Sequence, residues 1–180
     1  MARFLFCIVA LLWFSGFSAA QSRDRVEVFG GYSLMVPDFT GTSSNASGWD
    51  VSANVNLVRH VGVVADFSGF YPSGPNGCNC GAAVAAFHSY LVGPQASLSI
   101  GRIKPFARFL IGATIGSYTH ADSQGGSDFT QISYGGGGGV DYGINRWFAV
   151  RGQADWLHTG SVNGGSGNVA RLAAGLVFRF

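Results

Sequence analysis

The sequence predicts an all-β fold, an eight-stranded antiparallel up-and-down transmembrane β-barrel. Eight segments alternate in steps of two between an apolar residue and a polar or small one, which is the pattern of a strand with one face in lipid. The connections between these segments alternate between long and short, as barrels that cross a membrane require. The last segment keeps its alternation up to the terminal Phe180. These three observations agree on one architecture.

The beginning of the chain has the parts of a secretory signal peptide. Arg3 supplies a positive start, residues 4–14 form an uninterrupted apolar run, and small residues up to Ala20 fit a cleavage site. The apolar run is shorter than the roughly 20 residues that a spanning helix needs, which disfavours a helical membrane anchor. We therefore expect a signal peptide over residues 1–20 and one barrel domain over residues 21–180.

The second segment, residues 49–57, shows the alternation most clearly. Helical spacing would mix its apolar and polar residues, whereas steps of two separate them completely, so a strand is indicated. The outward series is Trp49, Val51, Ala53, Val55 and Leu57, and the inward series is Asp50, Ser52, Asn54 and Asn56. The first and third segments, residues 26–34 and 61–71, follow the same rule, with Glu27 and Asp66 facing inward.

The remaining strands follow in the same way. They are expected over residues 87–100, 105–118, 129–144, 148–158 and 169–180. Pro94 lies within the fourth strand, and because proline cannot donate to the ladder, we expect a bulge or a local break there. In the eighth strand, Leu176, Phe178 and Phe180 share one face, and Arg171 and Arg179 share the other.

The lengths of the connections predict which end of the barrel is external. Long connections are expected around residues 37–47, 72–83, 120–128 and 159–168. Short turns are expected at Arg59-His60, Gly101-Arg102 and Asn145-Arg146. Transmembrane barrels have short turns on the periplasmic side and longer external loops, so the four long connections are the expected surface loops.

Several motifs of the chain resemble the small outer-membrane β-barrels of the OmpA-like and opacity-protein type. They are Ser89-Tyr90-Leu91-Val92-Gly93-Pro94, Lys104-Pro105-Phe106, the strand over residues 135–140, Arg146-Trp147-Phe148-Ala149-Val150-Arg151 and the closing Gly175-Leu176-Val177-Phe178-Arg179-Phe180. The resemblance implies an outer-membrane location and recognition by the barrel-assembly machinery through Phe180, Phe178 and Leu176. Unlike the two-domain members, the chain shows no periplasmic peptidoglycan-binding domain, so cell-wall anchoring is not implied.

Composition limits the classes of partner. Without Arg3, ten of the eleven basic side chains remain against nine acidic ones, so no strong field exists to attract nucleic acid. The chain is 47% hydrophobic and only 11% charged, which suits a membrane surface. We expect a monomer whose partners are outer-membrane lipid and lipopolysaccharide, the assembly machinery, and a surface ligand that the sequence does not identify.

The chemical motifs are few. The glycine run at residues 135–139 lacks the lysine of a phosphate-binding loop, and its glycines are expected to make room for long side chains inside the barrel. The four histidines are scattered without ligand spacing, so no metal and no cofactor are expected. Cys78 and Cys80 lie on a long loop of an exported chain, where a disulfide is favoured by the compartment and strained by the spacing. A loop disulfide, a labile redox-active pair and two free thiols all stay open.

Two other classes of protein are disfavoured. A lipid-modifying outer-membrane enzyme would need a serine, a histidine and an acid on adjoining strands, and His88 or His158 could only be forced into that role. No nucleophile-elbow motif supports it. A soluble lipocalin-like carrier would be apolar inside and polar outside, which is the reverse of the pattern at residues 49–57.

The inward series predicts a network of charges in the lumen. Folding the last hairpins sets Asp141 beside Arg151 and Asp155 beside Arg171, and closure of the barrel brings Glu27 near Arg179. The full set is Glu27, Asp50, Asp66, Arg108, Asp141, Arg151, Asp155, Arg171 and Arg179. An eight-stranded interior is about filled by side chains. We therefore expect a structural or adhesion-like protein that acts through its loops, with a narrow ion channel as the alternative.

Overall fold

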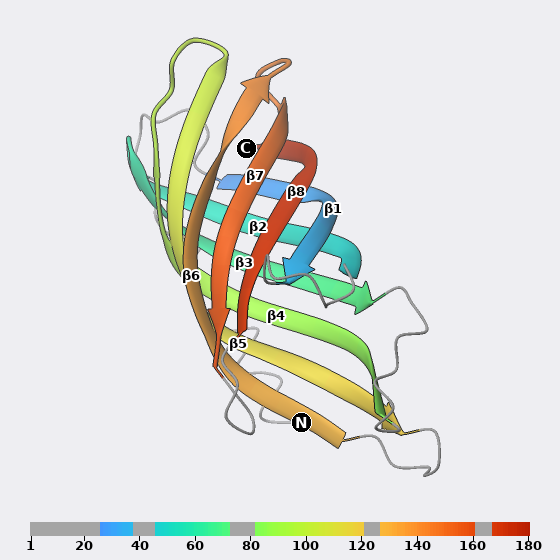
Figure 1. The fold of residues 1–180 in the computed structure, drawn as a ribbon. Helices are drawn as coiled ribbons and strands as arrows, with labels where there is room; N and C mark the ends of the chain where they lie inside the picture. Colours follow the sequence, from blue (N-terminus) through green and yellow to red (C-terminus); the bar gives the residue numbers. More distant parts are fainter. Residues whose placement is uncertain (1–25, 38–45, 73–81, 121–126, 161–166) are drawn as a thin grey trace, which may run out of the picture.

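The structure, a computed structural model, is a closed eight-stranded β-barrel in which every neighbouring pair of strands is antiparallel (Figure 1). It describes residues 26–37, 46–72, 82–120, 127–160 and 167–180. The strands are β1 (Val26–Pro37), β2 (Ala46–Val58), β3 (Val61–Pro72), β4 (Ala82–Ser97), β5 (Ile103–His120), β6 (Ser127–Gly143), β7 (Phe148–Thr159) and β8 (Gly167–Arg179). The predicted fold class is confirmed, and the predicted signal peptide lies outside the described residues.

The barrel closes through pairing of the first strand with the last. β1 pairs with β8 from Glu27↔Arg179 to Pro37↔Val169. Figure 1 shows the blue β1 and the red β8 side by side. Closure leaves no open sheet edge, which a barrel in lipid requires because hydrocarbon cannot satisfy backbone polar groups. None of the described segments forms a helix of the length and hydrophobicity needed to cross a bilayer.

The strands differ from the predicted bounds mainly at their ends. β4 ends at Ser97, and Ile100 pairs with Ile103 across a two-residue turn in which Gly101 has a φ of 63°. Glycine suits this position because a side chain disfavours positive φ. At the other end β4 begins at Ala82, five residues before the predicted start. The hydrogen-bonded ladder of β4 extends there beyond the residues in which apolar and polar side chains clearly alternate.

Pro94 changes the ladder without a bulge. The pairing of β4 with β5 runs from Val92↔Ile111 directly to Gln95↔Arg108, so it is interrupted at the proline while the register is unchanged. This is the local break that proline's missing N–H predicts. The register shift in β4 lies instead near its start, between Val84 and Ala86.

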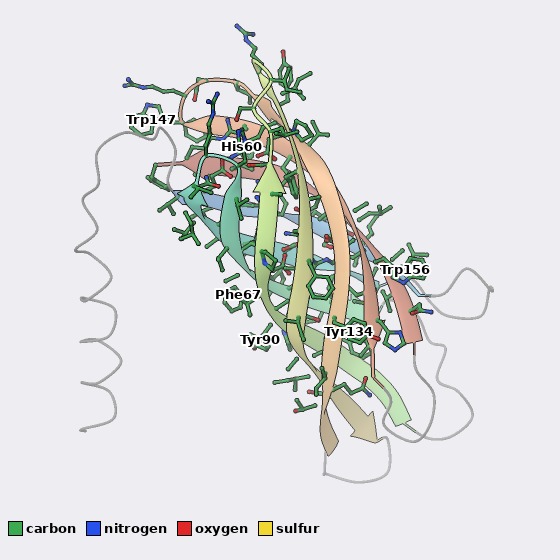
Figure 2. The ribbon with its side chains drawn as sticks, turned by 90° about the vertical axis from the view of Figure 1, so that its left-hand side faces the viewer. His60, Phe67, Tyr90, Tyr134, Trp147 and Trp156 are labelled. Carbon is green, nitrogen blue, oxygen red and sulfur yellow. The ribbon has the colours of Figure 1, made fainter. Side chains whose placement is uncertain are left out.

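The outer surface of the barrel is apolar. β7 alternates between exposed and buried residues from Phe148 to Leu157, and the other strands alternate similarly in their central parts, except that the glycine run of β6, residues 135–139, is half-buried throughout. Figure 2 shows Phe67 and Tyr90 projecting from the wall, and their exposed fractions are 42% and 49%. Exposed aromatic residues gather near both ends. Trp49, Tyr71 and Trp156 lie toward the long loops, and Trp147, Phe148, Phe178 and Phe180 lie near the short turns. This is the surface of a lipid-embedded barrel.

The glycine run in β6 makes room for the lumen. A Cβ atom at Gly137 would collide with the carbonyl oxygen of Ala154 and with Oδ1 of Asp155. Gly135 and Gly139 would meet the backbone of β7 in the same way. The run therefore lets the wall approach the charged side chains inside the barrel, as the sequence predicts.

Candidate functional site

The candidate functional site is the lumen, where the inward positions of seven of the eight strands bring charged side chains together. Eight of the nine predicted lumen charges are buried, and the ninth, Arg179, has a side chain that is 11% exposed. They come from β1, β2, β3, β5, β6, β7 and β8. Strand alternation alone explains their direction, because each has lipid-facing neighbours on either side.

A central cluster contains Asp50, Asp66, Asp155, Arg108 and Arg171. Arg171 donates to Asp66 Oδ1 at 2.7 Å and to Asp155 Oδ2 at 2.9 Å. Arg108 donates to both oxygens of Asp155, at 2.9 and 2.7 Å, and its Nη1 lies 3.1 Å from Asp66 Oδ2. Asp50 accepts a bond of 2.8 Å from Gln153 and lies 3.8 Å from Arg171. The two arginines are thus shared among three carboxylates.

A second set of charges, the turn-side cluster, lies nearer the short turns. It contains Glu27, Asp141, Lys104, Arg151 and Arg179. Arg151 donates to both oxygens of Asp141 at 2.7 and 3.0 Å. Arg179 lies 3.3 Å from Glu27 and 3.2 Å from Asp141. Lys104 donates to Glu27 Oε1 at 2.6 Å.

The structure contains all three cross-strand pairs expected from the hairpins, Asp141 with Arg151, Asp155 with Arg171 and Glu27 with Arg179. It also contains pairs that sequence reasoning missed. Lys104 lay one residue before the predicted fifth strand, so its direction was not predicted, although it lies four residues before the inward Arg108 and shares its side of the strand. The bonds across the lumen, such as Arg171 to Asp66, depend on the shear of the barrel, which alternation does not reveal.

Apolar and hydroxyl layers fill the lumen beside the charges. One apolar cluster contains Phe29, Ala149, Ala173 and Val177, and another contains Val64, Leu91, Leu110 and Leu157. The guanidinium of Arg151 lies 4.4 Å from the ring centre of Phe106. Toward the long loops, the hydroxyls of Ser89, Thr114, Ser133 and Thr159 form a chain with separations of 3.0, 2.8 and 3.4 Å.

Some buried polar atoms in the lumen have no partner within the described part of the chain. They include Asp50 Oδ1, Ser52 Oγ and Asn54 Oδ1 on β2, and both amide atoms of Gln95 on β4. Gln153 Oε1 on β7 is another such atom. Buried polar groups are costly unless hydrogen-bonded, so the lumen suits enclosed water.

Comparison with known proteins identifies solved structures that share this fold. No protein-family model and no curated protein match the chain. Among solved structures, Neisserial surface protein A (NspA) is 17% identical, with a TM-score of 0.69 over 89% of this chain and 100% of that one. The attachment invasion locus protein Ail of Yersinia pestis is 13% identical, with a TM-score of 0.61 over 88% of this chain and 100% of its own. The chain has the fold of the small outer-membrane β-barrels.

A third structure of this kind, the outer membrane protein OprG from Pseudomonas aeruginosa, is 11% identical, with a TM-score of 0.56 over 89% of this chain and 98% of that chain. At such low identity the likeness concerns the fold alone. The roles of individual residues in this small outer-membrane barrel therefore rest on its own geometry.

The predicted assembly residues lie on the outer face of β8 and at its end. Leu176, Phe178 and Phe180 are 46%, 41% and 65% exposed. The ring of Phe178 packs edge-on against Phe148 with their centres 4.8 Å apart. A receptor could thus contact these side chains without disturbing the lumen.

The remaining chemical candidates do not come together. His158 Nδ1 lies 2.8 Å from Asn168 Oδ1, and His60 Nδ1 lies 3.2 Å from the carbonyl oxygen of Ser97. The buried acids face the opposite side of the wall from His88 and His158. Within the described residues, no group of three His, Cys, Asp or Glu side chains could hold a metal ion. Cys78 and Cys80 lie outside the described residues.

Proposed function

We propose that this chain is an integral outer-membrane β-barrel with a structural or surface-interaction role, exported by a signal peptide cleaved near Ala20. The observation that supports this role best is the combination of an apolar outer belt with a lumen closed by buried ion pairs. A protein of this kind presents two surfaces to the cell, its lipid face and its loops. The four long connections are the proposed contact region.

The central cluster supports a closed lumen. Arg108 and Arg171 join carboxylates from β3 and β7, so their bonds cross the interior instead of following one wall. A solute would have to break several charge-assisted hydrogen bonds in a poorly solvated space, and stranding one member of a buried pair costs about 3–5 kcal/mol. Free diffusion of metabolites is therefore not expected.

The comparisons support a surface role. The similar structures include a protein named as a surface protein and one named for attachment and invasion. Ail has also been solved with the heparin analogue sucrose octasulfate. In this chain, however, residues 38–45, 73–81, 121–126 and 161–166 contain no lysine or arginine. We therefore propose a ligand that is not a polyanion, which is recognised by hydrogen bonds and small apolar contacts.

Binding of the refolded protein to whole cells and matrix proteins tests the surface role, whereas lipopolysaccharide, as a polyanion, should contact the barrel as membrane lipid and not through the loops. Replacing each long connection in turn with a short Gly-Ser segment should abolish binding for at least one bait and leave the barrel folded. A heparin-like polyanion serves as the control bait and should not bind. Binding that survives replacement of all four connections would contradict a loop-mediated role.

The unpaired atoms along β2 and β4 favour a narrow ion channel as the second candidate. Ser52, Asn54 and Gln95 would line a hydrated path beside the central cluster. Planar-bilayer recordings of the refolded protein separate the two candidates. A closed lumen predicts no steady conductance, whereas single-channel steps that Gln95→Leu changes would favour the channel.

We propose no enzymatic activity, no cofactor and a monomeric barrel in contact with outer-membrane lipid and lipopolysaccharide. The separation of histidines from buried acids across the wall supports the first point, since a hydrolase needs them in contact. Incubation with phospholipid or lipopolysaccharide followed by mass spectrometry of the lipids tests it. Release of a fatty acid that His158→Ala abolishes would contradict the proposal.

A further inference from the structure

Among the side chains that the structure describes, the exposed charged ones all lie at one end of the barrel. Arg59, Arg102 and Arg146 are exposed, and each lies in a different short turn. The acidic side chains whose burial the structure describes, Glu27, Asp50, Asp66, Asp141 and Asp155, are all buried in the lumen. Among the described side chains, the short-turn end therefore carries three exposed cations and no exposed acid, beside the α-carboxylate of Phe180.

Backbone hydrogen bonds join the three turns into one continuous rim. Each turn is tied to the next structural unit around the barrel, and the last bond closes β8 onto β1. The bonds run from Ser97 N to His60 O at 2.8 Å, Gly143 N to Arg102 O at 2.8 Å, Arg179 N to Trp147 O at 2.9 Å and Phe180 N to Val26 O at 2.9 Å. The backbones that carry the three arginines are thus held in fixed relative positions.

Two of the turns are also fixed internally. The turn that carries Arg102 is closed by reciprocal bonds between Ile100 and Ile103, of 2.8 and 3.0 Å. In the turn that carries Arg146, the side-chain oxygen of Asn145 accepts bonds of 2.8 Å from the backbone N–H groups of both Trp147 and Phe148. A side chain on a rigid turn loses less entropy when it binds than one on a mobile loop.

The apolar side chains around the rim set its depth in a bilayer. Trp147 and Phe180 are 49% and 65% exposed, and such aromatic residues lie at the level of lipid headgroups. The guanidinium of Arg146 stands 4.8 Å from the ring centre of Trp147. Figure 2 shows Trp147 and His60 at the same end of the barrel, away from Tyr134 and Trp156. In a bilayer, this depth would bring the three arginines to the level of the phosphate groups.

The lumen strengthens this polarity. The turn-side cluster contains three cations, Lys104, Arg151 and Arg179, but only two carboxylates, Glu27 and Asp141. The central cluster has the opposite excess, with three carboxylates and two arginines. The barrel interior thus adds positive potential at the end that carries the exposed arginines.

We propose that this cationic rim, Arg59, Arg102 and Arg146, binds the phosphate groups of anionic phospholipids in the leaflet at the short-turn end. A planar guanidinium can donate two parallel hydrogen bonds to a phosphate, and basic residues at an anionic membrane surface are attracted to it. The long-loop end has no exposed Lys or Arg among its described side chains, so the other leaflet is not favoured. The proposal rests only on a barrel that spans a bilayer, and it is independent of any surface ligand.

Quenching of Trp147 by brominated lipids tests the proposal. The double substitution Trp49→Phe and Trp156→Phe leaves Trp147 as the single tryptophan of residues 21–180. This protein is folded into vesicles of phosphatidylcholine that contain a small equal fraction of brominated phosphatidylglycerol or brominated phosphatidylcholine. We expect the anionic lipid to be enriched about threefold to fivefold beside Trp147, and the enrichment should shrink as salt is raised.

Two triple variants separate charge from other causes. Replacing Arg59, Arg102 and Arg146 with glutamine should remove the preference, whereas replacing them with lysine should retain most of it. All three sites are exposed turn positions, and gel mobility before boiling checks that each variant is folded. Equal quenching by the two lipids in the parent protein would overturn the proposal. A preference that persists unchanged in the glutamine variant would overturn it as well.

Discussion

At the residue scale, the lumen is a set of charges that cannot be changed one at a time. Arg171 bonds to both Asp66 and Asp155, and Asp155 bonds in turn to Arg108. Because each carboxylate is shared, loss of one arginine leaves more than one acid undercompensated. Coupling of this kind makes the effects of single substitutions larger than the value of any one contact.

The pair of Asp141 and Arg151 offers the cleanest test of this coupling. Arg151→Leu should lower the free energy of unfolding by about 3–5 kcal/mol, because Asp141 is left buried with a weaker partner. The double variant Asp141→Leu and Arg151→Leu should recover much of that loss. Urea titration of the folded barrel in vesicles measures both.

The exposed Arg146→Leu is the control for that experiment and should leave stability nearly unchanged. If the double variant loses the sum of the two single effects, the two side chains do not act as a pair.

Gly137 shows the same dependence on neighbours for a residue without a side chain. Gly137→Ala would place a Cβ against Ala154 and Asp155, and we expect a loss of about 1–3 kcal/mol from overpacking. Gly152 lies on the lipid face of β7 with nothing within 4 Å of a Cβ atom, so Gly152→Ala is the matched control. Equal unfolding midpoints for the two variants in urea would show that β6 can move away from β7.

At the element scale, the alternation along a strand determines which side chains face inward, and the hydrogen-bonded ladder determines how long the strand is. The predicted inward residues of β7, Arg151, Gln153 and Asp155, are all buried, because a period of two leaves no other choice once one face meets lipid. The ends were harder to predict. Lys104 lies at the edge of β5, where the alternation had not yet begun, and its bond to Glu27 depends on a strand end that the sequence does not mark.

The last residue of the chain has separate backbone and side-chain roles. The backbone of Phe180 bonds to Val26 and helps to close the barrel, while its ring is exposed. Phe180→Ala keeps the backbone bonds, so it should slow insertion by the assembly machinery while changing stability by about 1 kcal/mol or less. Insertion into proteoliposomes that contain the machinery, followed over time on gels, measures the rate.

Trp147→Ala is the matched control, since Trp147 is also an exposed aromatic at the short-turn end, whereas Phe148 packs on the predicted assembly residue Phe178. It should insert at the normal rate. Equal slowing of both variants would indicate that any interfacial aromatic serves and that the terminal residue is not specifically recognised.

At the scale of the whole molecule, topology followed from the sequence more readily than the interior arrangement did. Alternating connection lengths and an even strand count were enough to predict closure of β1 on β8, and hence the meeting of Glu27 with Arg179. The bonds across the lumen depend on how far each strand is staggered, which no local pattern encodes. The possible disulfide between Cys78 and Cys80 stays a prediction.

Closure predicts resistance of the whole barrel to detergent. Every strand has two neighbours, so unfolding must break ladders on both sides of a strand at once. The unboiled protein should migrate differently from the boiled protein on a detergent gel and should fractionate with outer membranes. Identical mobility in both states would contradict a closed barrel.

The charge balance inside the barrel has a consequence for how such a sequence diverges. Five carboxylates and five cations share the lumen, so an accepted replacement at one of these positions requires a compensating replacement on a different strand. Lipid-facing positions carry no such linkage, because any apolar side chain satisfies the bilayer. Substitutions should therefore accumulate quickly at lipid-facing positions, whereas substitutions of lumen charges should occur in compensating pairs.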